Sequence, residues 1–378
     1  MGISVIQAVS EADREKVFEF RYRVYVEELG LSPPGADHAR KRLLDPLDEV
    51  SVSHALFEDG EAVGSLRVTF LDDVPDPTPL IEKFEMAPAI AAMGRSAICT
   101  TSRFILHPRL RQGKAIFQLM ASAYEQVMAR GNFRLNYGDC SPHLLPFYEH
   151  LGYRQYTRAY NDTVYGFKIL ILMLGRDRGR FEHVRSPLLR VVSRYPDDPE
   201  AREWFERTYP DYLHIESAPF LPEGVFFDML GARVATDPLH SLGLLNSLDR
   251  VEADRFLAKA TLIQAGPGDR IVREGEPGDA LFVLLSGIAE VTLDESPDRP
   301  VAVLGAGDTF GEISFLTMKP RIANVVAKAP CELIVLSGEF LKRFIANEPA
   351  IAAKILLNLS RVLARRLSVT TRQAMRPR

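Results

Sequence analysis

The sequence predicts two domains of different fold class: an α/β domain in the N-terminal half, and a C-terminal antiparallel β-roll of jelly-roll type with flanking helices. Three observations lead to this prediction. The chain has 378 residues, more than one ordinary core requires, since single domains usually run to about 100–200 residues. Strand-like and helix-like stretches alternate up to Leu174, as in α/β sheets. From Pro267 onward, short strands alternate with Pro-Gly and Asp/Gly turns, as in an antiparallel roll.

Composition narrows the classes of function. The 46 Lys and Arg residues nearly balance the 50 Asp and Glu residues, so no global charge points to nucleic acid as a partner. Cys99, Cys140 and Cys331 are odd in number and far apart, which favours buried thiols in a reducing compartment. Neither a membrane-spanning apolar stretch nor a signal-peptide pattern is present in the sequence. We therefore expect a soluble, cytoplasmic protein.

Hydrophobic periodicity predicts the elements of the N-terminal half. An amphipathic pattern predicts a helix over residues 11–29. Strands are expected over 54–58 and 62–70, and Asp59-Gly60 between them supplies the positive φ angles of a tight hairpin. The later elements are expected to be a strand over 97–106, a turn at 108–113, a helix up to 128 ended by Gly131, a strand over 133–138, a helix over 142–151, and strands over 153–159 and 164–174.

Three regions are expected along the chain: an α/β domain over 1–178, a connector over 179–242 and the roll over 243–378. The connector has many prolines and no clear period, which predicts a partly helical segment. Its aromatic side chains are expected to pack against a neighbouring domain, because free linkers seldom carry so many; they are Trp204, Phe205, Tyr209 and Tyr212. A last helix is predicted from about 349 to 369, with its apolar side formed by Ile351, Ile355, Leu356, Leu359, Val362 and Leu363.

The most specific signal in the chain is Phe310 to Leu316, followed after a short loop by Pro320 to Val325. Turns and strands precede it, in order, at 267–269, 274–276, 278–279 and 281–287. Over residues 244–368, these segments resemble the roll and phosphate-binding cassette of cyclic-nucleotide-binding domains. The resemblance implies seven nucleotide-binding residues: Gly311, Glu312, Ile313, Ser314, Arg321, Ile322 and Ala323.

Each part of the cassette suits the chemistry of a cyclic nucleotide. Arg321 offers the phosphodiester a charge-assisted hydrogen bond, and Gly311 lets the backbone approach it. Glu312 is the implied acceptor for the ribose 2′-hydroxyl. Ala323 stands where members that prefer cGMP have Thr, so the resemblance favours cAMP and leaves cGMP open. The alternative is a surface ion pair between Glu312 and Arg321 on a roll that has lost its ligand.

A second resemblance covers about residues 5–175. Leu145 to Arg154 resembles the last helix and turn of the GCN5-related N-acyltransferase (GNAT) fold, and Phe104 to Ala115 resembles its turn into the pyrophosphate-binding helix. Within this fold, the chain is most similar to acyl-homoserine-lactone synthases and long-chain N-acyl amino acid synthases. The motifs that carry this narrower resemblance are at 20–28, 45–48, 64–67 and 102–104.

Acyl transfer from a thioester to an amine requires a neutral amine, oxyanion stabilisation and a proton for the leaving thiolate. The resemblance implies catalytic roles for Tyr148, as proton donor to sulfur, and for Arg103, Glu85 and Asp48. A packed aromatic ring is the alternative role for Tyr148. Residues implied to bind the acyl donor, through backbone N–H groups, cations and the turn before a helix, are Thr101, Ser102, Phe104, Arg109, Arg111, Gly113 and Lys114. Lys114 stands where the pyrophosphate loop usually has Gly, which fits a donor on acyl carrier protein as well as a weakened coenzyme A site.

The charged residues Arg23, Asp45 and Arg67 are implied to form the substrate site; structural salt bridges are the alternative. Thr100 replaces the Glu of the synthase motif, which puts lactone synthesis in doubt. Glu85 or Asp139 is left as the base for the amine. The histidines lack metal-ligand spacing, so we expect no metal site.

The function expected from these features is transfer of an acyl group from acyl carrier protein or acyl-coenzyme A to an amine, favoured to be an amino acid, under control of cAMP. Two alternatives remain open: a cAMP-regulated protein lysine acetyltransferase, and a non-catalytic adaptor that senses the nucleotide. DNA is not an expected partner, because the tail after Leu367 is too short for a recognition helix. The direction of the nucleotide effect and pairing into a homodimer are left open.

Overall fold

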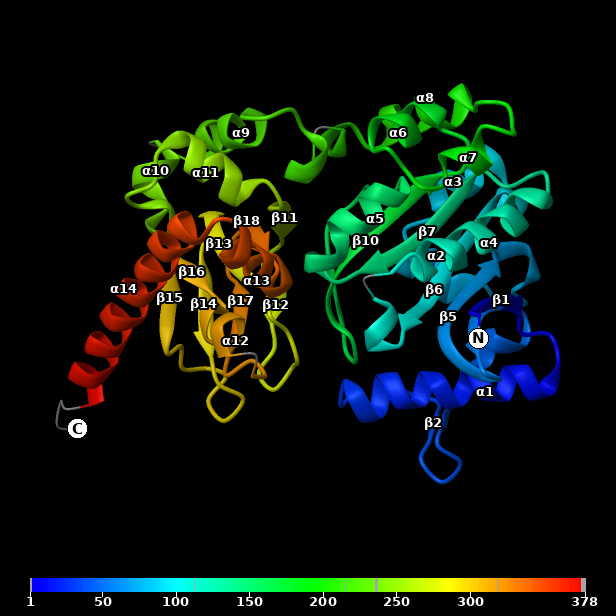
Figure 1. The fold of residues 1–378 in the computed structure, drawn as a ribbon, viewed down its shortest axis with the longest axis horizontal. Helices are drawn as coiled ribbons and strands as arrows, with labels where there is room; N and C mark the ends of the chain where they lie inside the picture. Colours follow the sequence, from blue (N-terminus) through cyan, green and yellow to red (C-terminus); the bar gives the residue numbers. More distant parts are fainter. Residues whose placement is uncertain (1, 112, 214, 235–236, 318, 375–378) are drawn as a thin grey trace. The chain divides into compact units, whose positions relative to one another are not determined.

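The computed structural model describes residues 2–111, 113–213, 215–234, 237–317 and 319–374 (Figure 1). Contacts divide the chain into two compact units. Unit 1 consists of Met1–Cys140, Phe147–Thr157 and Leu170–His214. Unit 2 consists of Ser141–Pro146, Arg158–Ile169 and Ile215–Arg378. The stretch expected to be a connector is therefore divided, its first part packing with unit 1 and its second part with unit 2.

A mixed sheet forms the core of the N-terminal half, as the sequence predicts. Its strands follow the order β1-β4-β5-β6-β7-β10-β8, with β9 pairing to β10. The pairs β1·β4, β4·β5 and β5·β6 are antiparallel, and β6·β7 is parallel. The strands are β1 (Ser4–Gln7), β4 (Val52–Glu58), β5 (Glu61–Phe70), β6 (Ile98–Leu106), β7 (Leu135–Cys140), β8 (Arg154–Gln155), β9 (Tyr160–Asp162) and β10 (Gly166–Leu174).

Helices cover the two faces of this sheet. Helix α1 (Glu11–Tyr22) buries Val17 and Phe18 in a cluster with Ala55 and Phe57 of β4. Helix α4 (Ala115–Ala129) contacts β4 and β5 with a side that includes the buried residue Met120. Because successive side chains of a strand point to opposite faces, β5 directs Ser65 and Arg67 to one face and Leu66 and Val68 to the other. On β5, Arg67 thus lies on one face of the sheet, and apolar side chains lie on the other.

The hairpin predicted at Asp59-Gly60 is confirmed. Both residues take left-handed backbone angles, with φ of 51° and 82°, as a two-residue turn with positive φ at both central positions requires. Two other predictions need correction. The helix expected over 11–29 is α-helical only to Tyr22 and continues as a π-helix over Arg23–Glu28. The strand expected over 153–159 is reduced to β8, because Tyr153 and Tyr156 point into the core.

Several short elements have too little periodicity to be predicted. They are the hairpin of β2 (Ala36–Asp37) and β3 (Arg42–Leu43), helices α2 (Thr78–Lys83) and α3 (Ala87–Met93), and the edge strand β1. The helix predicted over 142–151 does form, as a 3-10 turn over Pro142–Leu144 followed by α5 (Leu145–Leu151). The connector forms short helices: α6 (Arg178–His183), α7 (Leu189–Val192), α8 (Pro199–Thr208), α9 (Val225–Arg233) and α10 (Pro238–Ser241). Trp204 and Phe205 are buried, and Tyr209 contacts Tyr156 with ring centres 5.3 Å apart, all within unit 1.

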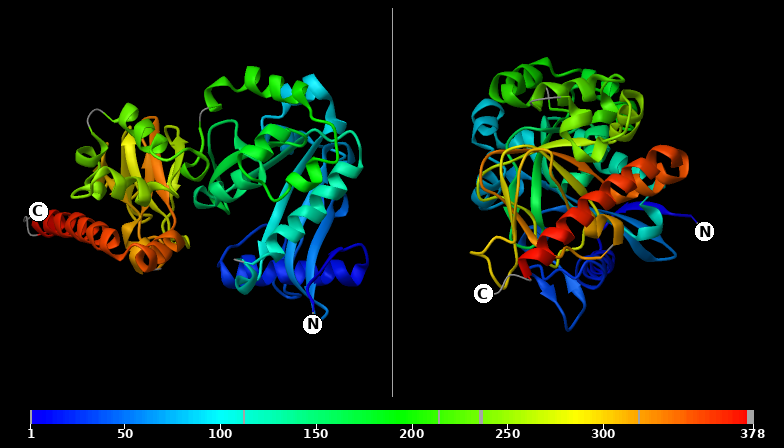
Figure 2. Two further views of the ribbon diagram at one scale, coloured as in Figure 1. Left: turned by 45° about the horizontal axis from the view of Figure 1, so that its top comes forward. Right: turned by 90° about the vertical axis from the view of Figure 1, so that its left-hand side faces the viewer.

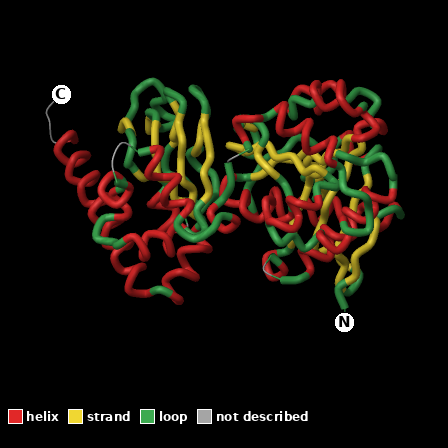
Figure 3. The backbone as a smooth tube through the Cα atoms, turned by 90° about the horizontal axis from the view of Figure 1, so that it is seen from above, coloured by secondary structure: helices red, strands yellow, loops and turns green. Residues whose placement is uncertain are grey.

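The roll in unit 2 consists of two four-stranded antiparallel sheets, ordered β11-β18-β13-β16 and β12-β17-β14-β15 (Figure 3). Their strands are β11 (Thr261–Ala265), β12 (Arg270–Val272), β13 (Leu281–Ser286), β14 (Ala289–Thr292), β15 (Ala302–Leu304), β16 (Thr309–Phe310), β17 (Asn324–Ala327) and β18 (Cys331–Leu336). The helices are α11 (Arg250–Leu257), α12 (Glu312–Thr317), α13 (Gly338–Asn347) and α14 (Pro349–Ala374). The predicted C-terminal fold class is confirmed.

Helix α14, the long red helix of Figure 2, extends beyond the predicted end at 369. Its predicted apolar side is confirmed, because Ile351, Ile355 and Leu359 are buried in the core of the roll. The three cysteines are buried and free, as predicted. Among the helices of the described ranges, none combines the length and apolar character needed to cross a membrane.

Candidate active site and candidate nucleotide site

Strands β6 and β7 separate in the middle of the sheet. Their parallel pairing runs from Ile98 with Leu135 to Thr100 with Tyr137, although both strands continue beyond this point. On its other edge, β6 has a bulge against β5, where Arg103 takes a left-handed φ of 53°. Bulges of this kind commonly redirect a side chain next to a functional site. The backbone from Thr101 to Phe104 thus lies where the two strands diverge.

A buried cluster of charges lies on the face of the sheet that carries Arg67. Asp45 accepts from Arg67 Nη1 and from Arg103 Nη2, each at 2.6 Å. Asp48 accepts from Arg21 Nη1 at 2.7 Å, and its Oδ1 lies 3.1 Å from Arg67 Nη1. Burial raises the pKa of Asp45, but Arg67 and Arg103 outweigh burial and hold this pKa at about 2. The Asp45 carboxyl is therefore ionised at neutral pH.

Arg21, not Arg23, completes this cluster. The Arg21 side chain is fully buried, and besides Asp48 it donates to Ser53 and Ser65. Burial lowers its pKa. Arg23, the residue expected in the substrate site, is half-exposed and lies 4.0 Å from Glu61. A signal for Arg21 was present in the sequence, because it follows Val17 by four residues and therefore lies on the apolar side of its helix.

Tyr148 lies in an aromatic cluster with Phe104, Phe147 and Tyr153. Its ring centre is 6.4 Å, 5.4 Å and 5.6 Å from theirs, respectively. Its side chain is nearly buried, and burial raises its pKa well above the ordinary value. The hydroxyl therefore keeps its proton at neutral pH, as a proton donor must. The ring is also a packed aromatic, so both roles foreseen for Tyr148 are compatible.

The two carboxylates considered as bases lie in different surroundings. Asp139, in β7, pairs with Lys83 at 2.8 Å, and its charge helps to raise the pKa of Tyr148. Glu85 is exposed, has a left-handed φ of 49° and accepts from the Thr157 hydroxyl at 3.1 Å. Of the two, Asp139 is electrostatically coupled to Tyr148.

The cations expected at the acyl donor are engaged with carboxylates. Arg109 pairs with Glu58, and Arg111 donates to Glu28 at 2.6 Å and to the Leu106 carbonyl at 3.0 Å. These residues lie just before α4. Of the remaining donor residues, the Gly113 N–H bonds the Leu110 carbonyl, Lys114 is the residue preceding α4, and Ser102 accepts from Arg67. Gln112, within the predicted turn, lies outside the described residues.

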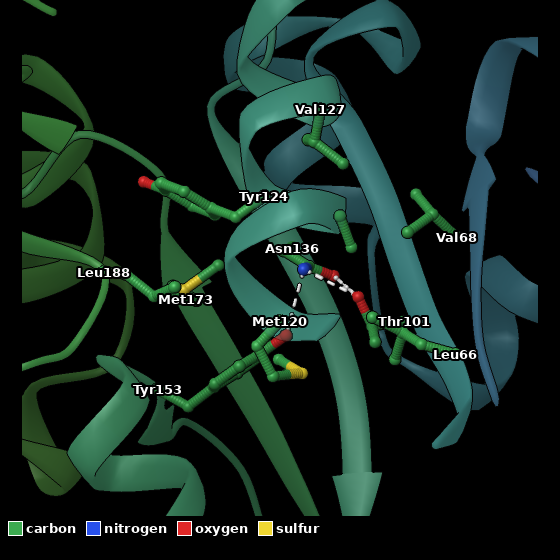
Figure 4. Close-up of a pocket in the computed structure, with 11 residues that line it drawn as sticks. Leu66, Val68, Thr101, Met120, Tyr124, Val127, Asn136, Tyr153, Met173 and Leu188 are labelled. Atoms are coloured by element: carbon green, nitrogen blue, oxygen red, sulfur yellow. Dashed lines mark hydrogen bonds between the residues drawn. The ribbon is translucent and has the colours of Figure 1, made fainter. Parts of the chain in front are cut away.

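A small cavity of about 10 Å³, room for about one water molecule, lies between the sheet and α4 (Figure 4). Its polar wall is a network in which Thr101 and Asn136 hydrogen-bond to each other and the Asn136 amide donates to the Tyr153 hydroxyl at 2.9 Å. Its other walls are apolar: Leu66, Val68, Met120, Ala123, Tyr124, Val127, Met173 and Leu188. Thr101 thus connects the point where the strands diverge with an apolar interior.

In unit 2, the predicted cassette surrounds Arg321. This side chain is buried, donates to the Gly311 carbonyl at 3.2 Å and lies over the Phe282 ring at 5.6 Å. Burial lowers its pKa to about 10, although Asp279, Glu276 and Glu312 act in the opposite direction. Gly311 has a φ of 82°, and a Cβ there would lie 2.7 Å from Arg321 Nη1. The approach of the backbone to the arginine therefore requires glycine.

The other cassette residues have distinct surroundings. Ser314 is buried and donates to the Pro320 carbonyl at 3.2 Å, and the Ile313 carbonyl accepts from Thr317. Ile322 is 56% exposed and Ala323 is half-buried. Glu312 is 5% exposed and forms its ion pair with Arg366 of α14. Glu312 and Arg321 are both buried, so they do not form the surface ion pair of the alternative; a roll without ligand stays an alternative that the structure does not test.

Comparison with known proteins identifies the two halves. Residues 16–174 match the family model described as "N-acyl amino acid synthase FeeM", and residues 262–348 match the "Cyclic nucleotide-binding domain" model. Among curated proteins, the chain is 36% identical over 107 residues to a cAMP-dependent protein kinase regulatory subunit of Emericella nidulans, covering 28% of this chain and 26% of that one. A subunit of the same name from Aspergillus niger is 35% identical over 107 residues, with the same coverage. The chain thus spans about a quarter of the length of these relatives.

Solved structures are similar only in part. A cyclic nucleotide-binding domain from Methylobacillus flagellatus is 26% identical and covers 44% of this chain and 88% of that one, with a TM-score of 0.36. The Thermus thermophilus catabolite activator protein is 30% identical and covers 35% of this chain and 61% of that one, with a TM-score of 0.32. At such low TM-scores, these likenesses add nothing to the sequence matches. Residues 16–174 of the chain thus match the N-acyl amino acid synthase family model, and residues 262–348 match the cyclic nucleotide-binding domain model.

Proposed function

We propose that the enzyme transfers an acyl group from a thioester on acyl carrier protein or coenzyme A to the amine of an amino acid, and that cAMP controls this reaction. One observation carries the catalytic part: strands β6 and β7 diverge after Thr100, beside both the cluster of Asp45 and Arg103 and the Tyr148 ring. A thioester carbonyl lying between the strands meets backbone N–H groups, a fixed cation and a protonated hydroxyl. These groups meet the needs of acyl transfer.

The proposed step forms a C–N bond and breaks the C–S bond. The neutral amine attacks the thioester carbonyl, and N–H groups of the segment from Thr101 to Phe104 stabilise the oxyanion. The tetrahedral intermediate collapses with loss of the thiolate, which takes a proton from Tyr148. The attacking nitrogen gives up one proton to Asp139, directly or through water. Asp139 is favoured over Glu85 because its charge acts on Tyr148.

The cluster of Arg67, Arg103 and Asp45 is proposed to hold the substrate site in shape. Arg103 supplies a cation close to the diverging strands, and Asp45 fixes its direction. Such a paired guanidinium suits the carboxylate of an amino acid, because it offers directional donors that never lose their charge. Arg23, half-exposed beside Glu61, is proposed to act only at the rim of this site.

The cavity beside Thr101 is the proposed entrance for the acyl chain. Its present volume holds about one water molecule, so a chain must displace its walls. Met120 and Met173 line it and adapt readily, because an unbranched thioether has several rotamers of similar energy. The donor's phosphate is proposed to bind near Lys114 and Arg111, once Arg111 leaves Glu28.

The nucleotide part of the proposal rests on Arg321. The Arg321 guanidinium is buried, and Gly311 allows the backbone of the cassette to approach it closely. A cyclic phosphodiester would supply the anion that offsets its burial. The curated relatives bear the name of cAMP-dependent proteins, and Ala323 occupies the position that has Thr in members that prefer cGMP, which together favour cAMP.

A substrate panel tests the proposal. Purified full-length enzyme would receive acyl-carrier-protein and acyl-coenzyme A donors of several chain lengths, the standard amino acids, and cAMP. Formation of N-acyl amino acid, detected by mass spectrometry, supports the proposed reaction. Acetylation of a lysine peptide from acetyl-coenzyme A, without any N-acyl amino acid, would instead identify a protein lysine acetyltransferase. If no acyl product forms, the remaining alternative is an adaptor that senses the nucleotide and catalyses no reaction.

A further inference from the structure

The hairpin formed by β9 and the start of β10 belongs to the same compact unit as the nucleotide cassette. This β9–β10 hairpin, residues 158–169, is part of unit 2, although it lies within the range that matches the N-acyl amino acid synthase family model. Strand β10 continues through Leu174 in unit 1, where it follows β7 in the order of the sheet. One strand therefore begins in the unit of the cassette and ends in the sheet that carries Asp139.

Within unit 2, the β9–β10 hairpin lies along residues 269–276 of the roll. At the end of this contact, Gly166 has a φ of 71° and lies so close to the Glu276 carboxylate that a Cβ there would clash with it. The hydrogen bonds that precede it, in the same order along both segments, join Asn161 to Asp269 and to the Arg270 N–H, each at 3.2 Å, and the Thr163 carbonyl to Arg273 at 2.9 Å.

The backbone of Glu276 contacts the arginine of the cassette. The Arg321 N–H donates to the Glu276 carbonyl at 2.9 Å, and the Gly275 N–H donates to the Arg321 carbonyl at 2.8 Å. Gly278 of the same loop packs against the guanidinium, because a Cβ there would lie 3.2 Å from Arg321 Nε. Glu276 thus contacts the β9–β10 hairpin with its side chain and the phosphate-binding arginine with its backbone.

The Glu276 carboxylate is half-buried among cations of both segments. Burial raises its pKa, although Arg273, Lys168 of β10 and Arg321 act in the opposite direction. An anion bound to Arg321 adds a like charge near a carboxylate that burial already destabilises. At about 12 Å and an effective dielectric constant of about 20, the repulsion between two such charges weakens binding about tenfold.

We propose that Glu276 couples the nucleotide site to the acyltransferase part of the chain, because its carboxylate contacts the β9–β10 hairpin and opposes the phosphodiester at Arg321. This inference rests on the proposed binding of cAMP. The bound anion disfavours the position of the carboxylate against Gly166, so the contact with the hairpin weakens. Coupling between two sites is reciprocal, so the intact contact weakens nucleotide binding by the same factor.

The test compares Glu276→Gln with Glu295→Gln in the full-length chain. Glu295 is exposed in the loop after β14, so its substitution removes an equal charge at a different place on the roll. Calorimetry measures cAMP affinity, and hydrogen exchange follows the backbone amides of residues 161–167. We expect cAMP to speed this exchange in wild type and in Glu295→Gln. Glu276→Gln should bind cAMP about tenfold more tightly than wild type and show the same exchange with and without cAMP.

The outcomes separate this inference from the proposed function. If wild type binds cAMP and exchange at 161–167 does not change, the hairpin does not respond to the nucleotide, and the inference is wrong although nucleotide binding stands. If cAMP speeds exchange equally in Glu276→Gln, another residue provides the coupling, and the inference is again wrong. If neither wild type nor either variant binds cAMP, the proposed nucleotide binding fails, and the inference fails with it.

Discussion

Asp45 holds Arg103 through an ion pair of 2.6 Å between Asp45 Oδ2 and Arg103 Nη2. Arg103 is the residue with left-handed φ in the bulge of β6, and Asp45 begins a short helix whose first N–H groups it also caps. A single carboxylate therefore links the loop before β4 with the point where the central strands diverge. The position of the cation depends on this link.

Replacement of Asp45 by Asn should damage both stability and catalysis. Asn keeps the shape of the side chain but lacks the negative charge that Arg67 and Arg103 stabilise. The lowered pKa of Asp45 corresponds to about 2 kcal/mol of unfolding free energy, which the variant should lose. Urea unfolding measures this loss, and we expect the acyl-transfer rate to fall at least about tenfold. Asp211→Asn, at an exposed position, should change neither quantity. An unaltered Asp45→Asn enzyme would argue that the cluster is dispensable.

Acid should destabilise the fold in two separate steps. Burial lowers the pKa of His54 to about 4 from 6.5, so between these values the unfolded chain gains a proton that the folded chain does not, and about 3 kcal/mol of stability is lost. Asp45 follows, as its stabilisation disappears between pH 3.8 and about 2. Unfolding free energies measured from pH 8 to about pH 2 check this. His54→Leu should make the upper step smaller but not abolish it, because the pKa of His143 is also lowered to about 4. An upper step of unchanged size in this variant would mean that His54 does not cause it.

Tyr148→Phe should lower kcat and leave KM almost unchanged. The ring packing is kept, but the hydroxyl that gives a proton to the leaving thiolate is lost, and general acids typically contribute about 100-fold. Steady-state kinetics with an acyl-carrier-protein donor measures the change. Tyr195→Phe, which removes a hydroxyl elsewhere in unit 1, provides the control. A Tyr148→Phe enzyme with normal kcat would leave Tyr148 with a packing role only.

Ala323→Thr should shift nucleotide preference towards cGMP. A hydroxyl at this half-buried position adds one hydrogen bond to the bound nucleotide, worth up to a factor of about ten in affinity. Competition calorimetry with cAMP and cGMP measures the ratio of the two affinities. Ala302→Thr, on an exposed edge strand, controls for the substitution itself. An unchanged ratio would mean that residue 323 does not contact the base.

Local patterns predicted the main elements of both sheets, because alternating apolar residues and turn dipeptides act over a few residues. The hairpin at Asp59-Gly60 is such a case. The π-helical turn after Tyr22 was missed, since it keeps the composition of an ordinary helix. The short strand β1 was missed as well, because four residues carry too little periodicity.

The sequence also predicted the residues of the candidate sites better where they are close together in the chain than where they are far apart. The residues of the nucleotide cassette are close in sequence, and Gly311 of the predicted set contacts Arg321. Arg21 and Arg366 were missed as site residues because their partners, Asp48 and Glu312, are 27 and 54 residues away. Such pairs arise from tertiary packing and leave no local pattern. An arginine on the apolar side of a predicted helix, such as Arg21, is the sequence feature that can indicate a buried ion pair of this kind.

The most direct test of a cAMP-controlled acyltransferase is the rate of N-acyl amino acid formation as a function of cAMP concentration. Wild type, Arg321→Gln and the exposed control Arg299→Gln would be compared with one donor and one amino acid. We predict that cAMP changes the rate in wild type and in Arg299→Gln, and that Arg321→Gln, which lacks the cation for the phosphate, does not respond while its rate without nucleotide is retained. Rates that are the same at every cAMP concentration in wild type would contradict the account.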